Sequence, residues 1–486
     1  MIKNKKMKKL FLVILTAFAL TSCGNDWLDV AQPHDGSVTP NIIYADQATV
    51  TNAIVGSIDL MKEYYYDRHV TVGYRFYFLG LDFMGNDIVS NPGQWWTYES
   101  QWHPTISSKT GYQSSYYWAM FYEVINDVNT KIVGIQESTL GDAAKAAAVA
   151  ELKAIRAYSY FNLARAFQFS YVHAGENAPC VPLYTEPTSS ETKGNDRASM
   201  KEVFTQILAD LDEAVTTLTD ERADIFRINK RVALLWRANV NLEMGNWTAA
   251  AADAKAARAG YTLMSKAVYQ STGFNSIKDA NTEWIWGFPI QSDQAMGYAS
   301  LFSHIDIFRK QAGYKNFFIN ETFVPNFTDT DMRNTFVDIS ASYPSWGKWG
   351  SFKFQDNADA CGDYGMHRAS EMYLVEAEAL VRAGKETEGH AVLYELQKHR
   401  DPQAVKSANT GNDLVEEILL ERRKELYGEI GTEFFDLKRY NKPLVRNGNH
   451  AISHMFTIPA GAGDWLFQIP QSEFDRNPNI KVQNER

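Results

Sequence analysis

Leu242-Glu243-Met244-Gly245-Asn246-Trp247 is the stretch of this sequence that decides the fold. Residues 230–244 and 247–259, on either side of it, carry apolar side chains at the spacing of a helix. Gly245 and Asn246 stand between the two segments, and glycine is the residue that most readily ends a helix in a left-handed turn. The stretch therefore predicts a hairpin of two antiparallel helices.

The hairpin recurs later in the chain, over residues 369–383 and 387–398, with Gly384 at the turn. The small residues Ala249-Ala250-Ala251 after the first turn are typical of a tetratricopeptide repeat. We therefore predict a mostly α-helical protein with a framework of tetratricopeptide-like helical hairpins that is interrupted rather than regular. Helical spacing predicts further helices at 46–66, 116–132, 142–169, 200–218 and 414–427.

Two long segments, at about 81–111 and 297–363, lack any sustained period and are rich in aromatic residues, glycine and polar side chains. Long loops inside compact domains are usually functional. We interpret both as irregular ligand-binding loops inserted into the helical framework. A few short strands are also expected, the clearest at Trp284-Ile285-Trp286-Gly287-Phe288.

The N-terminus has the pattern of a bacterial lipoprotein signal. Five lysines precede the apolar run Leu10–Ala19, and Leu20-Thr21-Ser22-Cys23 follows it. We predict a signal peptide at 1–22, lipidation of Cys23, a tether at 23–40 and a single body at 41–486. An ordinary cleaved signal with an incidental cysteine is the alternative.

The charge of the chain argues against nucleic acid as a partner. The formal net charge is −10, and removal of the five lysines of the signal would make it −15 (−10 − 5). Nucleic-acid binding depends on the neutralisation of phosphates by lysine and arginine. We therefore expect no nucleic-acid partner.

No catalytic or metal-binding motif is recognisable. The chain has no HExxH, GxSxG, Walker A or dinucleotide-binding glycine pattern. His450 and His454 are four residues apart, but the glycine-rich flank argues against a metal site there. We expect no cofactor, although a structural calcium at Asp329-Thr330-Asp331 stays open. Cys180 and Cys361 either pair or are two buried thiols.

Several short motifs follow one another in a fixed order along the chain. They are Asp26-Trp27-Leu28-Asp29, Arg156–Arg165, Val181-Pro182-Leu183, Gly245-Asn246-Trp247, Arg368–Glu378, Glu421-Arg422-Arg423-Lys424-Glu425-Leu426, Phe434–Arg439, Ile469–Glu473 and Asn477-Pro478-Asn479. This ordered set resembles the SusD-like (RagB/SusD) family of surface lipoproteins. One departure is Glu433, which occupies a position where the family usually has arginine, and it puts the local packing of that turn in question.

The resemblance implies a protein that is lipid-anchored at the outer membrane and exposed on the cell surface. It implies capture of an oligosaccharide or starch-like polysaccharide, transfer to a SusC-like TonB-dependent transporter, and no enzymatic activity. A relative that captures peptides, with hydrogen-bonding edges in place of aromatic platforms, is one alternative. A surface glycosidase, which needs a pair of carboxylates in the cleft, is the other.

Aromatic rings cover the apolar faces of sugars, and polar side chains bond the hydroxyl groups. The first loop supplies the predicted glycan-binding residues Asn91, Trp95, Trp96, Tyr98, Gln101 and Trp102, and the second supplies Tyr343, Trp346 and Trp349. The competing interpretation is that these rings pin the loops onto the helices. Trp118, Trp236, Trp247, Trp284 and Trp286 are assigned to the framework.

Overall fold

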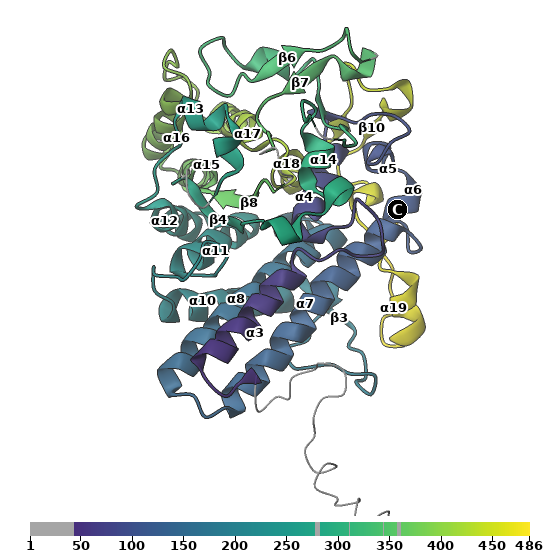
Figure 1. Cartoon of the computed structure of the whole chain (residues 1–486), viewed down its shortest axis with the longest axis vertical. Helices are drawn as coiled ribbons and strands as arrows, with labels where there is room; N and C mark the ends of the chain where they lie inside the picture. Colours follow the sequence, from purple (N-terminus) through teal and green to yellow (C-terminus); the bar gives the residue numbers. More distant parts are fainter. Residues whose placement is uncertain (1–42, 278–281, 311, 344, 357–360) are drawn as a thin grey trace, which may run out of the picture.

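The computed structural model describes residues 43–486, apart from 278–281, 311, 344 and 357–360. The predicted signal peptide, Cys23 and the predicted tether lie outside the described residues. Within the described part, helices dominate and strands are short, as the sequence predicts (Figure 1). The helices are α3 (Gln47–Leu60), α4 (Gly73–Met84), α5 (Thr97–Ser100), α6 (Pro104–Ser107), α7 (Tyr112–Glu137), α8 (Asp142–Phe167), α9 (Tyr171–Ala174), α10 (Met200–Thr217), α11 (Lys230–Met244), α12 (Trp247–Arg258), α13 (Lys266–Tyr269), α14 (Leu301–Ile305), α15 (Ala369–Arg382), α16 (Glu386–Arg400), α17 (Gly411–Leu426), α18 (Thr432–Arg439) and α19 (Gln471–Arg476).

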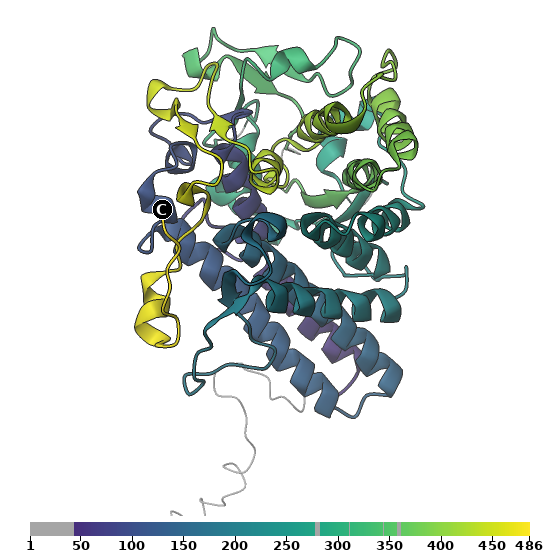
Figure 2. The ribbon, with the colours of Figure 1, turned by 180° about the vertical axis from the view of Figure 1, so that it is seen from behind.

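The two predicted hairpins are present as α11–α12 and α15–α16, on one flank of the molecule (Figures 1 and 2). Gly245 and Gly384 end the first helix of each pair with φ of +77° and +78°, a left-handed conformation that costs glycine nothing because it has no Cβ. Helix α12 packs against α15. The hairpins therefore stack on each other as neighbouring repeats do.

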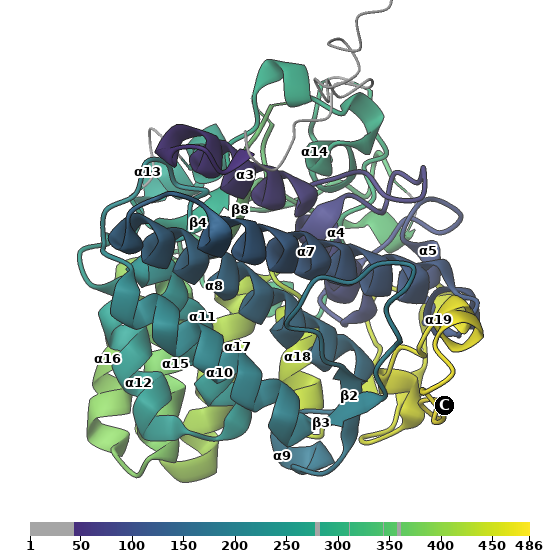
Figure 3. The ribbon, with the colours of Figure 1, turned by 90° about the horizontal axis from the view of Figure 1, so that it is seen from below.

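Helix α8 lies between α7 and α10 (Figure 3), and it is buried on most sides from Ala148 onward. Its Arg156 forms a two-pronged ion pair with Asp210 of α10, in which Nε and Nη2 each lie 2.8 Å from a carboxylate oxygen. The guanidinium carbon of Arg165 lies 3.8 Å from the centre of the Phe435 ring. Both arginines thus serve the packing of the central helix.

The predicted long loops contain more regular structure than the sequence indicates. Helix α4 runs on to Met84 and all its residues are buried, so the first loop begins at Gly85 rather than at 81. Four short antiparallel strands form one sheet in the order β1-β5-β7-β6, and this sheet joins the two loop segments. The sequence shows no periodicity here because each strand has only two or three residues. The strands are β1 (Ile88–Val89), β5 (Phe318–Ile319), β6 (Phe336–Asp338) and β7 (Trp349–Ser351).

Three further pairs of antiparallel strands complete the described fold. The strand predicted at Trp284–Phe288 is confirmed as β4, and it pairs with β8. Trp284 and Trp286 are 2% and 0% exposed, as expected of framework residues. The pairs are β2 (Pro179–Pro182) with β3 (Arg197–Ser199), β4 with β8 (Tyr364–Arg368), and β9 (Leu444–Val445) with β10 (Thr457–Ile458).

A cluster of buried charges joins the second loop segment to the hairpin helices. We call it the Glu425 cluster; its members are Glu283, Asp331, Arg333, Lys353, Arg368, Arg400, Glu425 and Glu429, whose side chains are at most 2% exposed. Glu425 contacts Arg333 at 2.9 Å, Arg400 at 2.7 Å and also Arg368. Burial opposes its ionisation, but the charges of the three arginines hold the pKa of Glu425 well below its ordinary value.

The cysteine question is settled for Cys180, whose thiol is free and buried, so it does not pair with Cys361. Burial raises the pKa of the Cys180 thiol to about 12, which makes it an inert packing residue. In the described residues no helix combines the length and the apolar character that crossing a membrane requires.

Candidate functional site

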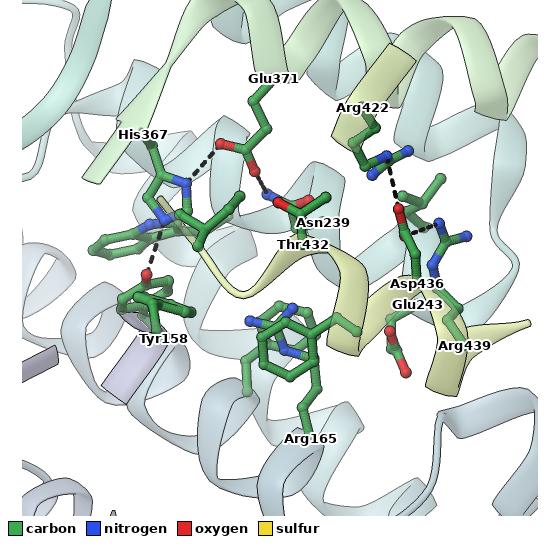
Figure 4. Close-up of a pocket in the computed structure, with 16 residues that line it drawn as sticks. Tyr158, Arg165, Asn239, Glu243, His367, Glu371, Arg422, Thr432, Asp436 and Arg439 are labelled. Atoms are coloured by element: carbon green, nitrogen blue, oxygen red, sulfur yellow. Dashed lines mark hydrogen bonds and ion pairs between the residues drawn. The ribbon is translucent and has the colours of Figure 1, made fainter. Parts of the chain in front are cut away.

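The interior of the molecule holds a small cavity between α8, α11, α15 and α18 (Figure 4). A chain of hydrogen bonds runs along one wall: Tyr158 Oη to His367 Nε2 (2.8 Å), His367 Nδ1 to Glu371 (2.7 Å), and Asn239 Nδ2 to Glu371 (2.8 Å). On the opposite wall Asp436 pairs with Arg439 at 2.8 Å. The cavity therefore lies where side chains from distant motifs meet.

The size of this cavity excludes it as a sugar site. Its volume is about 50 Å³, whereas pockets for small organic ligands measure roughly 300–1,000 Å³. Arg165 Nε and Thr432 Oγ1 line it and have no hydrogen-bond partner among the described residues. Buried polar groups of this kind are normally satisfied by water. We therefore interpret the cavity as part of the framework.

A second hollow lies at the surface, and we call it the Trp95 pocket. Its volume is about 340 Å³, which falls in the range of ligand sites. Three segments form it: the turn before α4, the loop around α5, and the first residue of α7. The lining residues are Arg68, Gly93, Gln94, Trp95, Trp96, Thr97, Tyr98, Glu99 and Tyr112.

Trp95 is partly exposed, and two other rings pack against it. His69 and Tyr314 lie 5.8 Å and 5.9 Å from it, measured between ring centres, and His69 Nδ1 is 2.7 Å from Tyr314 Oη. Tyr298 continues this row, 5.5 Å from Tyr314 and 50% exposed. Tyr98 is 46% exposed within the pocket. The site thus combines open aromatic surface with rings whose positions are already set.

Two of the predicted glycan-binding residues, Trp96 and Trp102, are buried rather than open to a ligand, with 1% and 5% of their surface exposed. Trp96 stacks on Phe83 at 5.2 Å, and its Nε1–H donates to His304 Nδ1 at 3.0 Å. Trp102 Nε1–H donates to the carbonyl of Met84 at 2.8 Å. Both residues have positive φ, a backbone conformation that is uncommon for residues other than glycine. They pin the loop onto α4, as the competing interpretation predicted.

The polar residues predicted beside them lie outside the pocket lining. Gln101 is partly buried, and its Nε2 is 3.4 Å from Ser453 Oγ. The carbonyl of Asn91 accepts hydrogen bonds from Gln94 N (3.2 Å) and Thr97 Oγ1 (3.3 Å), so Asn91 shapes the turn. Their predicted contact with a ligand would therefore need a glycan that extends beyond the Trp95 pocket.

The second predicted cluster is partly exposed but is tied to the four-stranded sheet. Tyr343 and Trp346 lie 5.0 Å and 5.5 Å from Phe318 of β5. Trp349 belongs to β7 and pairs with Ile319. None of the three is among the described residues that line the Trp95 pocket. The structure therefore does not bring the two predicted clusters into one pocket.

Sequence reasoning missed Arg68, His69 and Tyr112, all close to Trp95, as well as the more distant Tyr298. The signal was Tyr64-Tyr65-Tyr66-Asp67-Arg68-His69, an aromatic and charged run between two helices. Nothing in the local pattern relates this run to residue 95, because loops that are distant in sequence meet only in the folded protein.

His450 and His454 brace the floor of the same loop. His450 Nε2 is 2.9 Å from the carbonyl of Asn86, and its Nδ1 is 3.1 Å from Arg446 Nη1. Burial lowers the pKa of His450 to about 3, so it is neutral. His454 Nδ1 is 2.9 Å from Ser100 Oγ. The described residues contain no group of three histidine, cysteine, aspartate or glutamate side chains placed to hold a metal ion.

Glu433, the departure from the family pattern, anchors the beginning of the loop. Its Oε2 accepts the backbone N–H groups of Asn86 (2.6 Å) and Asp87 (3.0 Å). Arg423 pairs with Asp87 and lies 3.6 Å from Glu433. The turn that the sequence left in question is therefore packed against the loop that carries Trp95.

Comparison with known proteins gives consistent matches along the chain. A family model described as "SusD family" matches residues 329–486, and one described as "Starch-binding associating with outer membrane" matches residues 26–242. The curated SusD-like protein P38 of Formosa agariphila is 23% identical over 388 residues, which cover 67% of this chain and 72% of that protein.

Solved structures match over almost their full length. A SusD-like carbohydrate binding protein from Bacteroides vulgatus superposes with a TM-score of 0.81 and 25% identity, over 90% of this chain and 98% of that one. A laminarin binding SusD-like protein superposes with a TM-score of 0.71 and 22% identity, over 91% and 99%. The chain therefore shares the overall fold of these proteins.

Proposed function

The chain belongs to the SusD family, and on this premise we propose that it binds glycans, with the Trp95 pocket as the binding site. The observation that carries the proposal is the pair Trp95 and Tyr98, which offers open ring surface in a pocket of about 340 Å³. Isolated exposed aromatic residues are common, but several around one hollow mark a binding patch. The similarity to a carbohydrate binding protein of the same fold supports this assignment.

The chemistry of the pocket suits a sugar. The rings of Trp95 and Tyr98 provide flat apolar surface for the C–H face of a pyranose. Gln94 lines the same pocket, and its side-chain amide has both donors and an acceptor for sugar hydroxyls. The bracing rings of His69 and Tyr314 reduce the freedom that Trp95 would otherwise lose on binding.

The proposal includes no catalysis. Glu99 is the only carboxylate among the described residues that line the pocket. Its Oε1 accepts hydrogen bonds from Tyr112 Oη (2.7 Å) and from Gln113. Hydrolysis of a glycosidic bond usually requires two carboxyl groups on opposite sides of the bond. The lining of the pocket therefore fits a binding role better than a hydrolytic one.

We further propose that the protein acts at the outer membrane. The name of the N-terminal family model supports this location, and the predicted lipoprotein signal at 1–22, followed by Cys23, would provide a lipid anchor. In this arrangement the protein captures oligosaccharides at the cell surface and passes them to a SusC-like TonB-dependent transporter. The family resemblance supports this partner.

Substitution of Trp95 tests the binding site. Purified protein is run through native gels that contain a panel of neutral and acidic polysaccharides, and the strongest ligand is then titrated by calorimetry. We expect Trp95→Ala to weaken binding about tenfold, a loss of about 1.4 kcal/mol, which is within reach of the area that one ring buries at roughly 25 cal/mol per Å².

Trp247→Ala is the matched control, because Trp247 is also partly exposed but lies at the start of α12. Trp346→Ala tests the second predicted cluster. Retention of full affinity by Trp95→Ala, together with loss in Trp346→Ala, would move the site to the four-stranded sheet. Failure of every polysaccharide to retard the protein would contradict the proposed function itself.

A further inference from the structure

Arg68 places a positive charge in the Trp95 pocket. Its guanidinium carbon lies 4.5 Å from the centre of the Tyr112 ring, which is the geometry of a cation resting on an aromatic face. The residue is exposed, and no ion pair or hydrogen bond of its guanidinium with another described residue is present. All five of its N–H groups are thus available to an acceptor from outside the protein.

The nearest carboxylates do not neutralise this charge by direct contact. Asp67 forms a hydrogen bond with the hydroxyl of Tyr64. Glu99 is buried beneath Tyr112, and its Oε1 is taken by Tyr112 and Gln113. Burial raises the pKa of Glu99, and the hydrogen bonds from Tyr112 and Gln113 and the charge of Arg68 offset only part of this rise. Because Glu99 is buried and Arg68 is exposed, a ligand that enters the pocket meets the charge of Arg68 first.

The backbone holds Arg68 in place before any ligand arrives. Thr71 contacts the carbonyl of Arg68 twice, with its backbone N–H at 3.0 Å and its hydroxyl at 2.9 Å. A bridge between Tyr64 and Val72 closes the turn. A side chain whose backbone and ring contact are already ordered loses less entropy when it binds a ligand.

We propose that Arg68 recognises an anionic substituent on the glycan, either the carboxylate of a uronic acid or a sulfate ester, so that this protein selects acidic glycans. A guanidinium matches such oxyanions because two parallel N–H groups can reach two oxygens. The aromatic rings hold the sugar, and Arg68 reads its charge from the same pocket. This inference rests on the proposed glycan-binding function and specifies its substrate class.

The test compares acidic glycans with their own neutral forms. The probes are polygalacturonate and its fully methyl-esterified form, which differ at the carboxylate, and carrageenan and its desulfated form, which differ at the sulfate. Each is titrated into the wild-type protein, Arg68→Gln and Arg68→Lys. The first pair detects a preference for uronates and the second a preference for sulfate esters.

A matched control variant is Arg382→Gln. Arg382 is also exposed and also rests on an aromatic ring, 5.1 Å from the centre of Trp247. It lies at the end of α15, on the opposite side of the molecule from α5 (Figure 1). The control therefore removes the same charge from the same kind of environment, far from the pocket.

We expect at least one acidic probe to bind tenfold or more tightly than its neutral form. Arg68→Gln should abolish that preference, Arg68→Lys should keep part of it, and Arg382→Gln should leave it unchanged. The preference should also weaken between 0.05 and 0.5 M NaCl, since salt screens exposed charges. Binding of the neutral probes should be the same in wild type and Arg68→Gln.

Three results would overturn the inference in distinguishable ways. If acidic and neutral probes bind equally well and Trp95→Ala still weakens binding, the protein binds glycans but Arg68 does not select acidic ones. An acidic preference that persists in Arg68→Gln would place charge recognition elsewhere on the protein. If the protein binds none of the probes and no polysaccharide of the panel, both the proposed function and this inference are wrong.

Discussion

The Trp95 pocket and the Glu425 cluster both place arginine against aromatic rings, but they treat its charge differently. Arg68 rests on Tyr112 and has no carboxylate in direct contact among the described residues. Arg368 lies 5.6 Å from the centre of the Phe274 ring and contacts Glu283, Glu425 and Glu429. In the interior, where an unpaired charge is costly, each arginine forms ion pairs with carboxylates. At the surface, a charge can remain available to a ligand.

The two adjacent tryptophans show the same division. Trp96 donates its indole N–H to His304 and packs on Phe83, whereas Trp95 leaves part of its ring open to the pocket. One loop thus has a face that stabilises the fold and a face that is free for recognition. Substitutions at the two kinds of position should separate stability from binding.

The largest effect is expected at the centre of the Glu425 cluster. Glu425→Gln removes the negative charge that Arg333, Arg368 and Arg400 share, and breaking a buried ion pair from one side costs about 3–5 kcal/mol. Urea unfolding should show this loss. Glu416→Gln is the control, because Glu416 pairs with Lys442 at an exposed site where such pairs contribute about 0–1 kcal/mol. Equal free energies of unfolding for the two variants would show that the ion pairs of Glu425 do not stabilise the fold more than an exposed ion pair does.

The second largest effect is expected on the stability of variants at the two adjacent tryptophans. Trp96→Ala should destabilise the protein by about 3 kcal/mol, because a buried aromatic side chain is replaced by a cavity. Trp95→Ala should change the free energy of unfolding by less than about 1 kcal/mol while it weakens glycan binding. Thermal melts with parallel titrations measure both properties. A similar loss of stability in both variants would mean that Trp95 also belongs to the framework.

The smallest effect concerns Asp82, an interior carboxylate that lacks a partner for its Oδ2 among the described residues. Burial raises its pKa from 3.8 to about 7, and nearby Arg75 only partly offsets this. The folded state therefore binds more protons than the unfolded state between pH 4 and 7, so stability should fall as pH rises through this window.

Asp82→Asn should remove this fall in stability and leave the protein more stable than the wild type at pH 8, because the variant has no buried carboxylate that ionises as the pH rises. Urea unfolding of both proteins at pH 5 and pH 8 measures the effect. The two proteins should differ little at pH 5, where Asp82 is protonated in the folded state. A variant that is less stable at pH 8 would show that Asp82 is ionised and well compensated.

Much of the helical framework could be predicted because its signals are local. The Gly245 turn and the apolar spacing around it define a hairpin from about thirty neighbouring residues, within the range where periodicity is informative. The strands β1 and β5 could not be predicted in this way. Each has two residues, and Ile88 finds its partner Ile319 only after the helices between them have packed.

The candidate site was only partly predictable for the same reason. The 91–103 loop is polar and aromatic, and this composition correctly pointed to Trp95 and Tyr98 as partly open rings. Composition does not distinguish Trp95 from Trp96, however, because the direction of a side chain depends on backbone angles. The indole of Trp96 donates to His304, which lies in a different segment of the chain.

The helical hairpins, the family resemblance and the presence of aromatic loops follow from the sequence alone, because each of these depends on residues that are close together or occur in a fixed order. Which rings are open and which charges are free depends on how the folded chain packs. Arg68, Trp95 and Tyr112 come from three segments, and burial of each side chain is set by the packing of all of them. Exposure is a property of the assembled surface, so no local pattern in the sequence can encode it.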